Sequence, residues 1–127
     1  MGLAVSSRMT TISSHKDLQV WQLSMDLVDL SFDLVDALPA RYRFIFCNQI
    51  LRAAISIPSN IAEGSRRPRR AYLNHLSISL GSHGELETSV EVIKRRKFAS
   101  AVLLTRITDL GSSVGRMLHA LVVSLEQ

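Results

Sequence analysis

Apolar side chains recur along this chain at the spacing of helices that bury one face. In the stretch from about Leu18 to Leu38 they form two neighbouring stripes. The first contains Trp21, Met25, Val28, Phe32 and Val35, and the second contains Leu23, Leu27, Leu30, Leu34 and Leu38. Together the stripes make an apolar face wider than a helix needs inside a monomeric bundle. The pattern therefore predicts a first helix that also has surface available for another subunit.

Proline and glycine divide the middle of the chain. Pro39 ends the first helix, residues 40–43 are expected to turn the chain, and a second helix runs from about Phe44 to Glu63. Its apolar spacing continues in phase through Pro58, so we predict one kinked helix rather than two. Gly64 is expected to take the left-handed position at its end.

Two further helices complete the pattern. The third is predicted from Pro68 to about Arg96, with Gly81 and Gly84 on or beside its inner face, where a neighbouring backbone would come close. After Ser100, leucine, isoleucine, valine and methionine recur every 3.5 residues, as in bundled helices. Short connections between four helices predict an all-α, up-down-up-down antiparallel four-helix bundle over residues 17–127.

Charged residues on the inner faces predict a structural polar network. Glu87 falls on a core shoulder of the third helix, where an ionised carboxylate needs a partner. Arg52 on the second helix is the expected partner, in a buried or half-buried pair. Asn60 or Ser56 would complete its hydrogen bonds, and Glu63 lies on the same polar stripe as Arg52.

Acidic residues form a narrow stripe on the first helix, at Asp26, Asp29, Asp33 and Asp36. Such a stripe is typical of a solvated face, and it would equally suit contact with a basic neighbour. Both interpretations stay open at the level of sequence.

The composition narrows the class of protein. The chain has 127 residues, of which 46% are hydrophobic and 6% aromatic, so one core of aliphatic residues is expected. Cys47 is the sole cysteine, which excludes an intrachain disulfide and favours a cytoplasmic location. Residues 1–16 are interpreted as a flexible leader. No apolar run reaches the roughly 18 residues needed to span a bilayer, so no membrane association is expected.

Basic charge is concentrated at the connections between helices. The net charge is +4, yet seven arginines and one glutamate between residues 41 and 75 give +6, and residues 94–97 alone give +4. The candidate nucleic-acid-binding residues are Arg66, Arg67, Arg69, Arg70, Lys94, Arg95, Arg96 and Lys97. Arg67 is expected to precede the third helix without capping its free amides, which would suit a phosphate group. A solvated, solubilising turn is the competing interpretation.

Templates for catalysis, metals and cofactors are not met. Ser82 and His83 are adjacent on a helix and point about 100° apart, so they cannot act as nucleophile and base. The four histidines contain no H-x-x-x-H pair, and the Glu-x-x-His motifs of di-metal bundles are missing. The 64–70 turn lacks the spacing of a phosphate loop. We expect no metal, no cofactor and no enzymatic activity.

Three motifs in order also carry a family resemblance. They are D-L-Q-V-W-Q at 17–22, S-I-P-S-N-I-A-E-G at 56–64 and L-G-S-H-G-E-L-E at 80–87. The chain resembles the four-helix-bundle family encoded within intervening sequences of bacterial 23S rRNA genes, over roughly residues 17–126. That family is similar in turn to the accessory variability proteins of diversity-generating retroelements, which are basic pentamers that engage nucleic acid and a reverse transcriptase. The resemblance implies a homo-oligomer, with five subunits as the expected number, but no firm biochemical activity.

Two functions therefore compete ahead of an enzyme. The first is an oligomer that binds RNA or DNA through its basic connections without sequence specificity, because phosphates rather than bases would be contacted. The second is a protein-interaction or scaffold module that uses the acidic stripe and the apolar faces, with no nucleic-acid ligand.

Overall fold

The computed structural model describes residues 14–127. These residues form a short 3₁₀ helix and four long α-helices and contain no strand. The elements are η2 (His15–Asp17), α2 (Gln19–Ala37), α3 (Ala40–Gly64), α4 (Arg69–Arg96) and α5 (Ala101–Glu126). The all-α prediction is confirmed. The first thirteen residues of the predicted leader lie outside the described residues.

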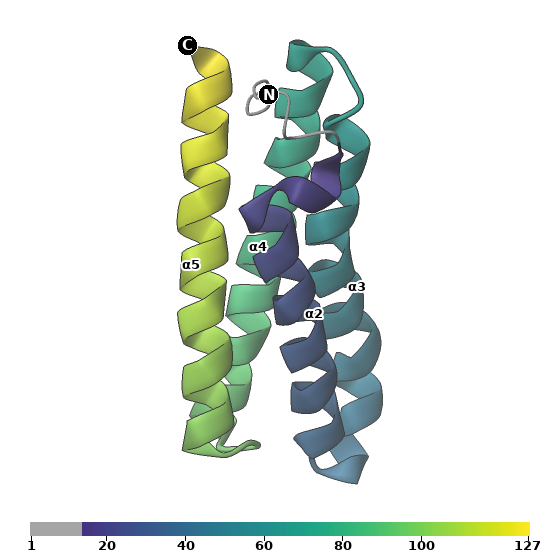
Figure 1. Ribbon diagram of the computed structural model, residues 1–127. Coiled ribbons are helices and arrows are strands. Elements are labelled where there is room, and N and C mark those ends of the chain that lie inside the picture. The colour runs from purple at the N-terminus through teal and green to yellow at the C-terminus, as the bar shows by residue number, and fades with distance from the viewer. Residues whose placement is uncertain (1–13) are drawn as a thin grey trace.

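Short connections force successive helices to run antiparallel. Figure 1 shows the α2–α3 and α4–α5 connections at one end of the bundle, and the α3–α4 connection at the other end, near the C-terminus. Each long helix contacts its neighbours in the chain, and α5 closes the bundle against α2. The predicted up-down-up-down topology is therefore confirmed. None of the helices within residues 14–127 has the length and hydropathy needed to cross a bilayer.

Aliphatic side chains from all four helices meet in one core. Leu34 from α2, Ile57 from α3, Leu76 from α4 and Leu118 from α5 are fully buried. Burying one such side chain stabilises the fold by about 1.5–3 kcal/mol relative to leaving it exposed. The second predicted stripe of α2 is buried from Leu27 to Leu38, whereas Met25 and Phe32 of the first stripe are exposed.

Helix α3 begins earlier than the sequence predicts. The connection from α2 consists of Leu38 and Pro39 alone, and residues 40–43 form the first turn of the helix rather than a loop. The carbonyl of Pro39 accepts hydrogen bonds from the amides of Tyr42 and Arg43, which makes proline the start of the helix. Pro58 lies inside a continuous α3, as predicted.

Gly64 corrects another expectation. It belongs to α3 and has no positive φ, so it does not take the left-handed position. Its lack of a side chain is required for packing, because a Cβ atom here would lie 2.8 Å from His75 Cβ and from Tyr72 Cδ1 on α4. As the last residue of α3, the glycine permits close approach of the two helices and does not provide a left-handed cap.

Buried serines line the face of α4 that meets α3. They are Ser79, Ser82 and Ser89. The Ser79 hydroxyl donates to the Ile57 carbonyl at 2.9 Å, and Ser82 donates to the Ser56 hydroxyl at 2.8 Å. We call these contacts the serine seam. Because serine is small and its hydroxyl finds a partner, the two helices pack closely along this seam.

The other glycines of α4 and α5 differ among themselves. Gly81, Gly84 and Gly111 have open space where a Cβ atom would lie, so the expected close approach at Gly81 and Gly84 does not occur within the described chain. At Gly115 a Cβ atom would lie 2.9 Å from the ring of His83. Only that glycine of α5 is required for contact with α4.

Candidate nucleic-acid interface

The connection between α3 and α4 contains the first group of predicted site residues. The amide of Ser65 donates to the Ile61 carbonyl and the amide of Arg67 donates to Gly64. Pro68, not Arg67, is the residue that precedes α4, and no side chain caps the helix. The uncapped helix start is confirmed, one residue later than predicted.

The four arginines of this connection differ in their partners. Arg67 forms an exposed ion pair with Glu63, with 3.1 Å between Nη2 and Oε2. Arg69 Nη1 donates to the Leu125 carbonyl at 2.9 Å, which satisfies a free carbonyl at the end of α5. Arg66 and Arg70 are exposed and have no carboxylate partner within residues 14–127. Two of the four arginines therefore form neither an ion pair nor a side-chain hydrogen bond in the described residues, and we call such cations uncommitted.

The end of α4 positions the second group, residues 94–97. Lys97 adopts the left-handed conformation, with φ 58° and ψ 41°. Its amide donates to the Lys94 carbonyl, and the amide of Phe98 donates to Ile93, each at 3.1 Å. This arrangement is a Schellman motif with lysine where glycine is usual. It turns the chain sharply and exposes the basic side chains around it.

Arg95 is the member of this group with an acidic partner. Its Nε donates to Glu91 Oε2 at 2.9 Å, and this hydrogen bond lowers the pKa of the Glu91 carboxyl. Lys94, Arg96 and Lys97 are exposed and form no ion pair within the described chain.

The first turn of α3 lies at the same end of the bundle (Figure 1). Arg43 Nη2 donates to the carbonyls of Leu38, at 3.1 Å, and Asp36, at 3.4 Å, and so covers the end of α2. Arg41 instead lies over the ring of Tyr42, 4.7 Å from its centroid.

Sequence reasoning missed an aromatic contact at this end. The rings of Tyr42 and Phe98 stack with centroids 4.3 Å apart and planes 18° apart. Each ring follows a basic residue in the sequence, in R-Y-R-F at 41–44 and R-R-K-F at 95–98. Because the predicted topology places both segments at one end, this repeated combination was the signal that could have identified the pair.

The predicted buried pair between Arg52 and Glu87 is wrong. Both residues are exposed, and no hydrogen bond or ion pair joins them. The inner face of α4 is centred on the serine seam, so Glu87 lies beyond its edge. The sequence pattern did not reveal this inner face, because serine is polar and a buried serine resembles a surface residue.

A polar network does exist, around Asn60. The Asn60 Nδ2 donates to the Ser56 carbonyl at 2.9 Å and to the Ser56 hydroxyl at 3.1 Å. Its Oδ1 therefore accepts from His75 Nδ1, at 2.9 Å. Glu63 lies at the exposed edge, with its Oε2 3.9 Å from His75 Nε2. This network joins α3 to α4.

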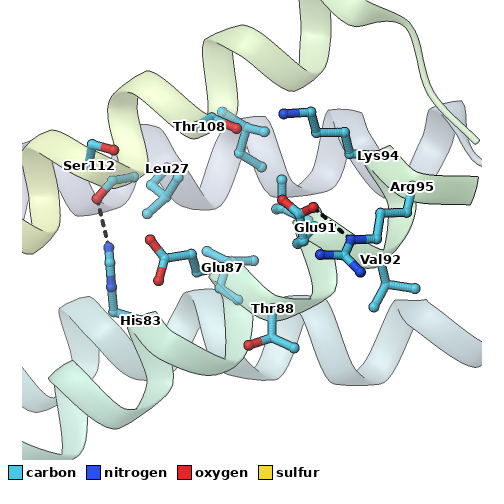
Figure 2. Close-up of a pocket in the computed structure, with 14 residues that line it drawn as sticks. Leu27, His83, Glu87, Thr88, Glu91, Val92, Lys94, Arg95, Thr108 and Ser112 are labelled. Carbon is cyan, nitrogen blue, oxygen red and sulfur yellow. Dashed lines mark hydrogen bonds and ion pairs between the residues drawn. The ribbon is translucent and has the colours of Figure 1, made fainter. Parts of the chain in front are cut away.

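A groove of about 580 Å³ separates parts of α4 and α5. Figure 2 shows Glu87 and His83 pointing into it from α4, with Thr108 and Ser112 on the opposite wall. His83 Nε2 lies 2.7 Å from the Gly111 carbonyl, which can only accept, so this nitrogen carries the proton. Within residues 14–127, no three His, Cys, Asp or Glu side chains gather to hold a metal.

Comparisons with known proteins agree with this architecture. Residues 16–120 match the family described as 23S rRNA-intervening sequence protein. Among solved structures, one similar chain is a protein of unknown function from the S23 ribosomal protein family of Bacteroides thetaiotaomicron. It superposes with a TM-score of 0.75 at 24% identity, and the match covers 81% of this chain and 97% of that one. This likeness supports the fold alone.

A comparison with curated proteins finds no match. The family match extends over most of the chain and includes all three sequence motifs. This chain belongs to the family of 23S rRNA-intervening sequence proteins.

Proposed function

We propose that this protein is a non-enzymatic homo-oligomer that binds nucleic acid without sequence specificity through the two basic ends of its bundle. The observation that supports this most directly is the set of exposed cations without carboxylate partners in the described chain. At the ends of the bundle they include Arg66 and Arg70 on one side and Arg41, Lys94, Arg96 and Lys97 on the other.

These cations are better suited to contacts with phosphates than to sequence-specific contacts with bases. Their positions follow from helix ends and connections, where long side chains extend into solvent. The acidic stripe, Asp26 to Asp36, lies along the exposed side of α2, and it reaches the end of the bundle where Arg43 donates to the Asp36 carbonyl. Phosphate contacts of this kind supply affinity that is independent of sequence and falls with salt.

An oligomer would multiply these contacts. On α2, Met25 and Phe32 are exposed in this chain although they belong to the predicted apolar stripe. Apolar surface of this kind favours contact with another subunit. We propose five subunits because of the family resemblance only. A mass near that of one chain in light scattering at micromolar concentration would contradict the oligomer.

The test is titration of labelled RNA and DNA at several salt concentrations. If about 4 to 8 phosphates are neutralised, the log-log slope of affinity against salt for duplex DNA is roughly −4 to −7. Replacing Arg66 and Arg70 by serine removes two uncommitted cations and should reduce that slope. Arg67→Ser is the matched control, because Arg67 is already paired with Glu63. It should change the slope less than either uncommitted position does.

A second candidate function is favoured by the composition of α2. Exposed Met25 and Phe32 alternate there with Asp26, Asp29 and Asp33, which gives an acidic surface with apolar anchors. Such a surface suits a basic protein partner. If the protein binds neither RNA nor DNA at about 50 mM salt, where phosphate contacts are strong, this scaffold function becomes the better proposal.

A further inference from the structure

Two connections combine into a layered stack at one end of the bundle. The Tyr42 and Phe98 rings stack with centroids 4.3 Å apart, and the Arg41 Cζ lies 4.7 Å from the centroid of Tyr42. The Arg96 Cζ lies 5.9 Å from the centroid of Phe98. Stacking and cation–π attraction hold these groups together. Two guanidinium groups therefore lie close to the ring pair, and guanidinium groups themselves stack on nucleobases.

Phe44 lies in the first turn of α3, two residues after Tyr42, and is 89% exposed. It follows Arg41 by three residues in the first turn of α3, so both side chains lie on the same face of the helix. A ring so exposed contributes almost nothing to the core of this chain. Its flat face is available for a planar ligand.

Cations without carboxylate partners surround the aromatic groups. Lys94, Arg96 and Lys97 come from the end of α4, which the left-handed Lys97 turns back across the bundle end. The Schellman motif at this point also fixes Phe98 against Tyr42, so the basic and aromatic groups are positioned by one turn. Phosphate-binding charge and stacking surface therefore lie together at this end.

We infer that this end is a stacking platform for single-stranded nucleic acid, with Phe44 and the Arg41 guanidinium receiving bases and Lys94, Arg96 and Lys97 contacting phosphates. The inference rests on the proposed function and narrows it to a ligand class and to one end of the bundle. In a duplex the base faces are already stacked on one another. Only a single strand can present bases to Phe44, whereas both forms can present phosphates.

The experiment uses the full chain and its Phe44→Ala variant. Labelled oligo(dT), oligo(U) and a duplex of equal length are titrated at several salt concentrations. Loss of one stacking contact should weaken single-strand binding roughly 5- to 160-fold. The salt slope should stay unchanged, because no phosphate contact is lost. Duplex binding should not change, and the two single strands show whether the platform prefers DNA or RNA.

Three variants act as controls. Phe44→Trp keeps a stacking ring, so it should retain affinity, and in a Trp21→Phe background its fluorescence should be quenched by bound single strands. Arg41→Lys keeps the charge but loses the planar guanidinium group, so it should weaken single-strand binding while the salt slope stays the same. Val123→Ala removes an exposed apolar group near the opposite end and should have no effect.

Two results would overturn the inference, and they differ in what they imply for the proposed function. If Phe44→Ala binds single strands as tightly as the parent does, the platform is wrong while phosphate binding by the basic ends stands. If the parent binds neither single strands nor duplex, the platform and the proposed function both fail.

Discussion

Helix α4 meets α3 along the serine seam and meets α5 across a groove. On the first side, Ser79 donates to a backbone carbonyl of α3, and Gly64 lets the two helices come close. On the second side, a groove of about 580 Å³ remains, and Gly84 and Gly111 face open space. Small residues thus differ in effect, even on the α5 side, where the His83 ring fills the space at Gly115 while Gly111 faces open space. They tighten an interface only where a neighbouring side chain or carbonyl fills the space that they leave.

The largest effect on stability is expected from adding a side chain to the closely packed interface between α3 and α4. In Gly64→Ala the new methyl group would meet His75 Cβ and the Tyr72 ring, and since His75 Cβ is fixed to the backbone, α4 itself must shift. Overpacking of this kind costs about 1–3 kcal/mol. The higher helix propensity of alanine offsets roughly 0.8–1 kcal/mol of that cost. Chemical denaturation should show a net loss of stability, and a variant more stable than the parent would contradict the contact.

A smaller effect should follow from removing one hydrogen bond of the serine seam. Ser79→Ala leaves the Ile57 carbonyl without its side-chain donor. The expected loss is about 1 kcal/mol in the free energy of unfolding. Ser77→Ala, at an exposed position of the same helix, is the matched control and should not destabilise the protein. Equal stability of the two variants would show that the seam depends on shape and not on hydrogen bonding.

The sequence predicted the helices, their order and the two basic ends, because apolar periodicity and proline positions are local signals. It misplaced Gly64, since the residues that require a glycine there, Tyr72 and His75, come from another helix. It also placed Glu87 on the core shoulder of α4 because buried serines resemble surface residues. Which charges remain uncommitted depends on distant partners, such as the carbonyl of Leu125 for Arg69. Local sequence patterns do not identify which distant group a charged side chain will contact.

On the side of α4 that faces open space, replacing a glycine is expected to stabilise the protein and not to destabilise it. In Gly84→Ala the added methyl group meets nothing within 4 Å, so the gain in helix propensity should be realised in full. The expected stabilisation is about 0.8–1 kcal/mol. Denaturation and light scattering should be measured together. A loss of stability accompanied by a lower mass would mean that another subunit packs against Gly84, which would replace the open space seen in the single chain.

The smallest effect concerns pH and the Tyr72 side chain, which packs against Gly64. Burial raises the pKa of the Tyr72 hydroxyl above its ordinary value of 10.0. Because the neutral hydroxyl is favoured in the folded state, its contribution to stability is fully present below the unfolded pKa and is lost as pH rises through the folded one. Thermal unfolding at several alkaline pH values should therefore show a steeper fall in Tm for the parent than for Tyr72→Phe. Identical slopes would mean that the hydroxyl reaches water when folded, and that the tight side of α4 ends short of Tyr72.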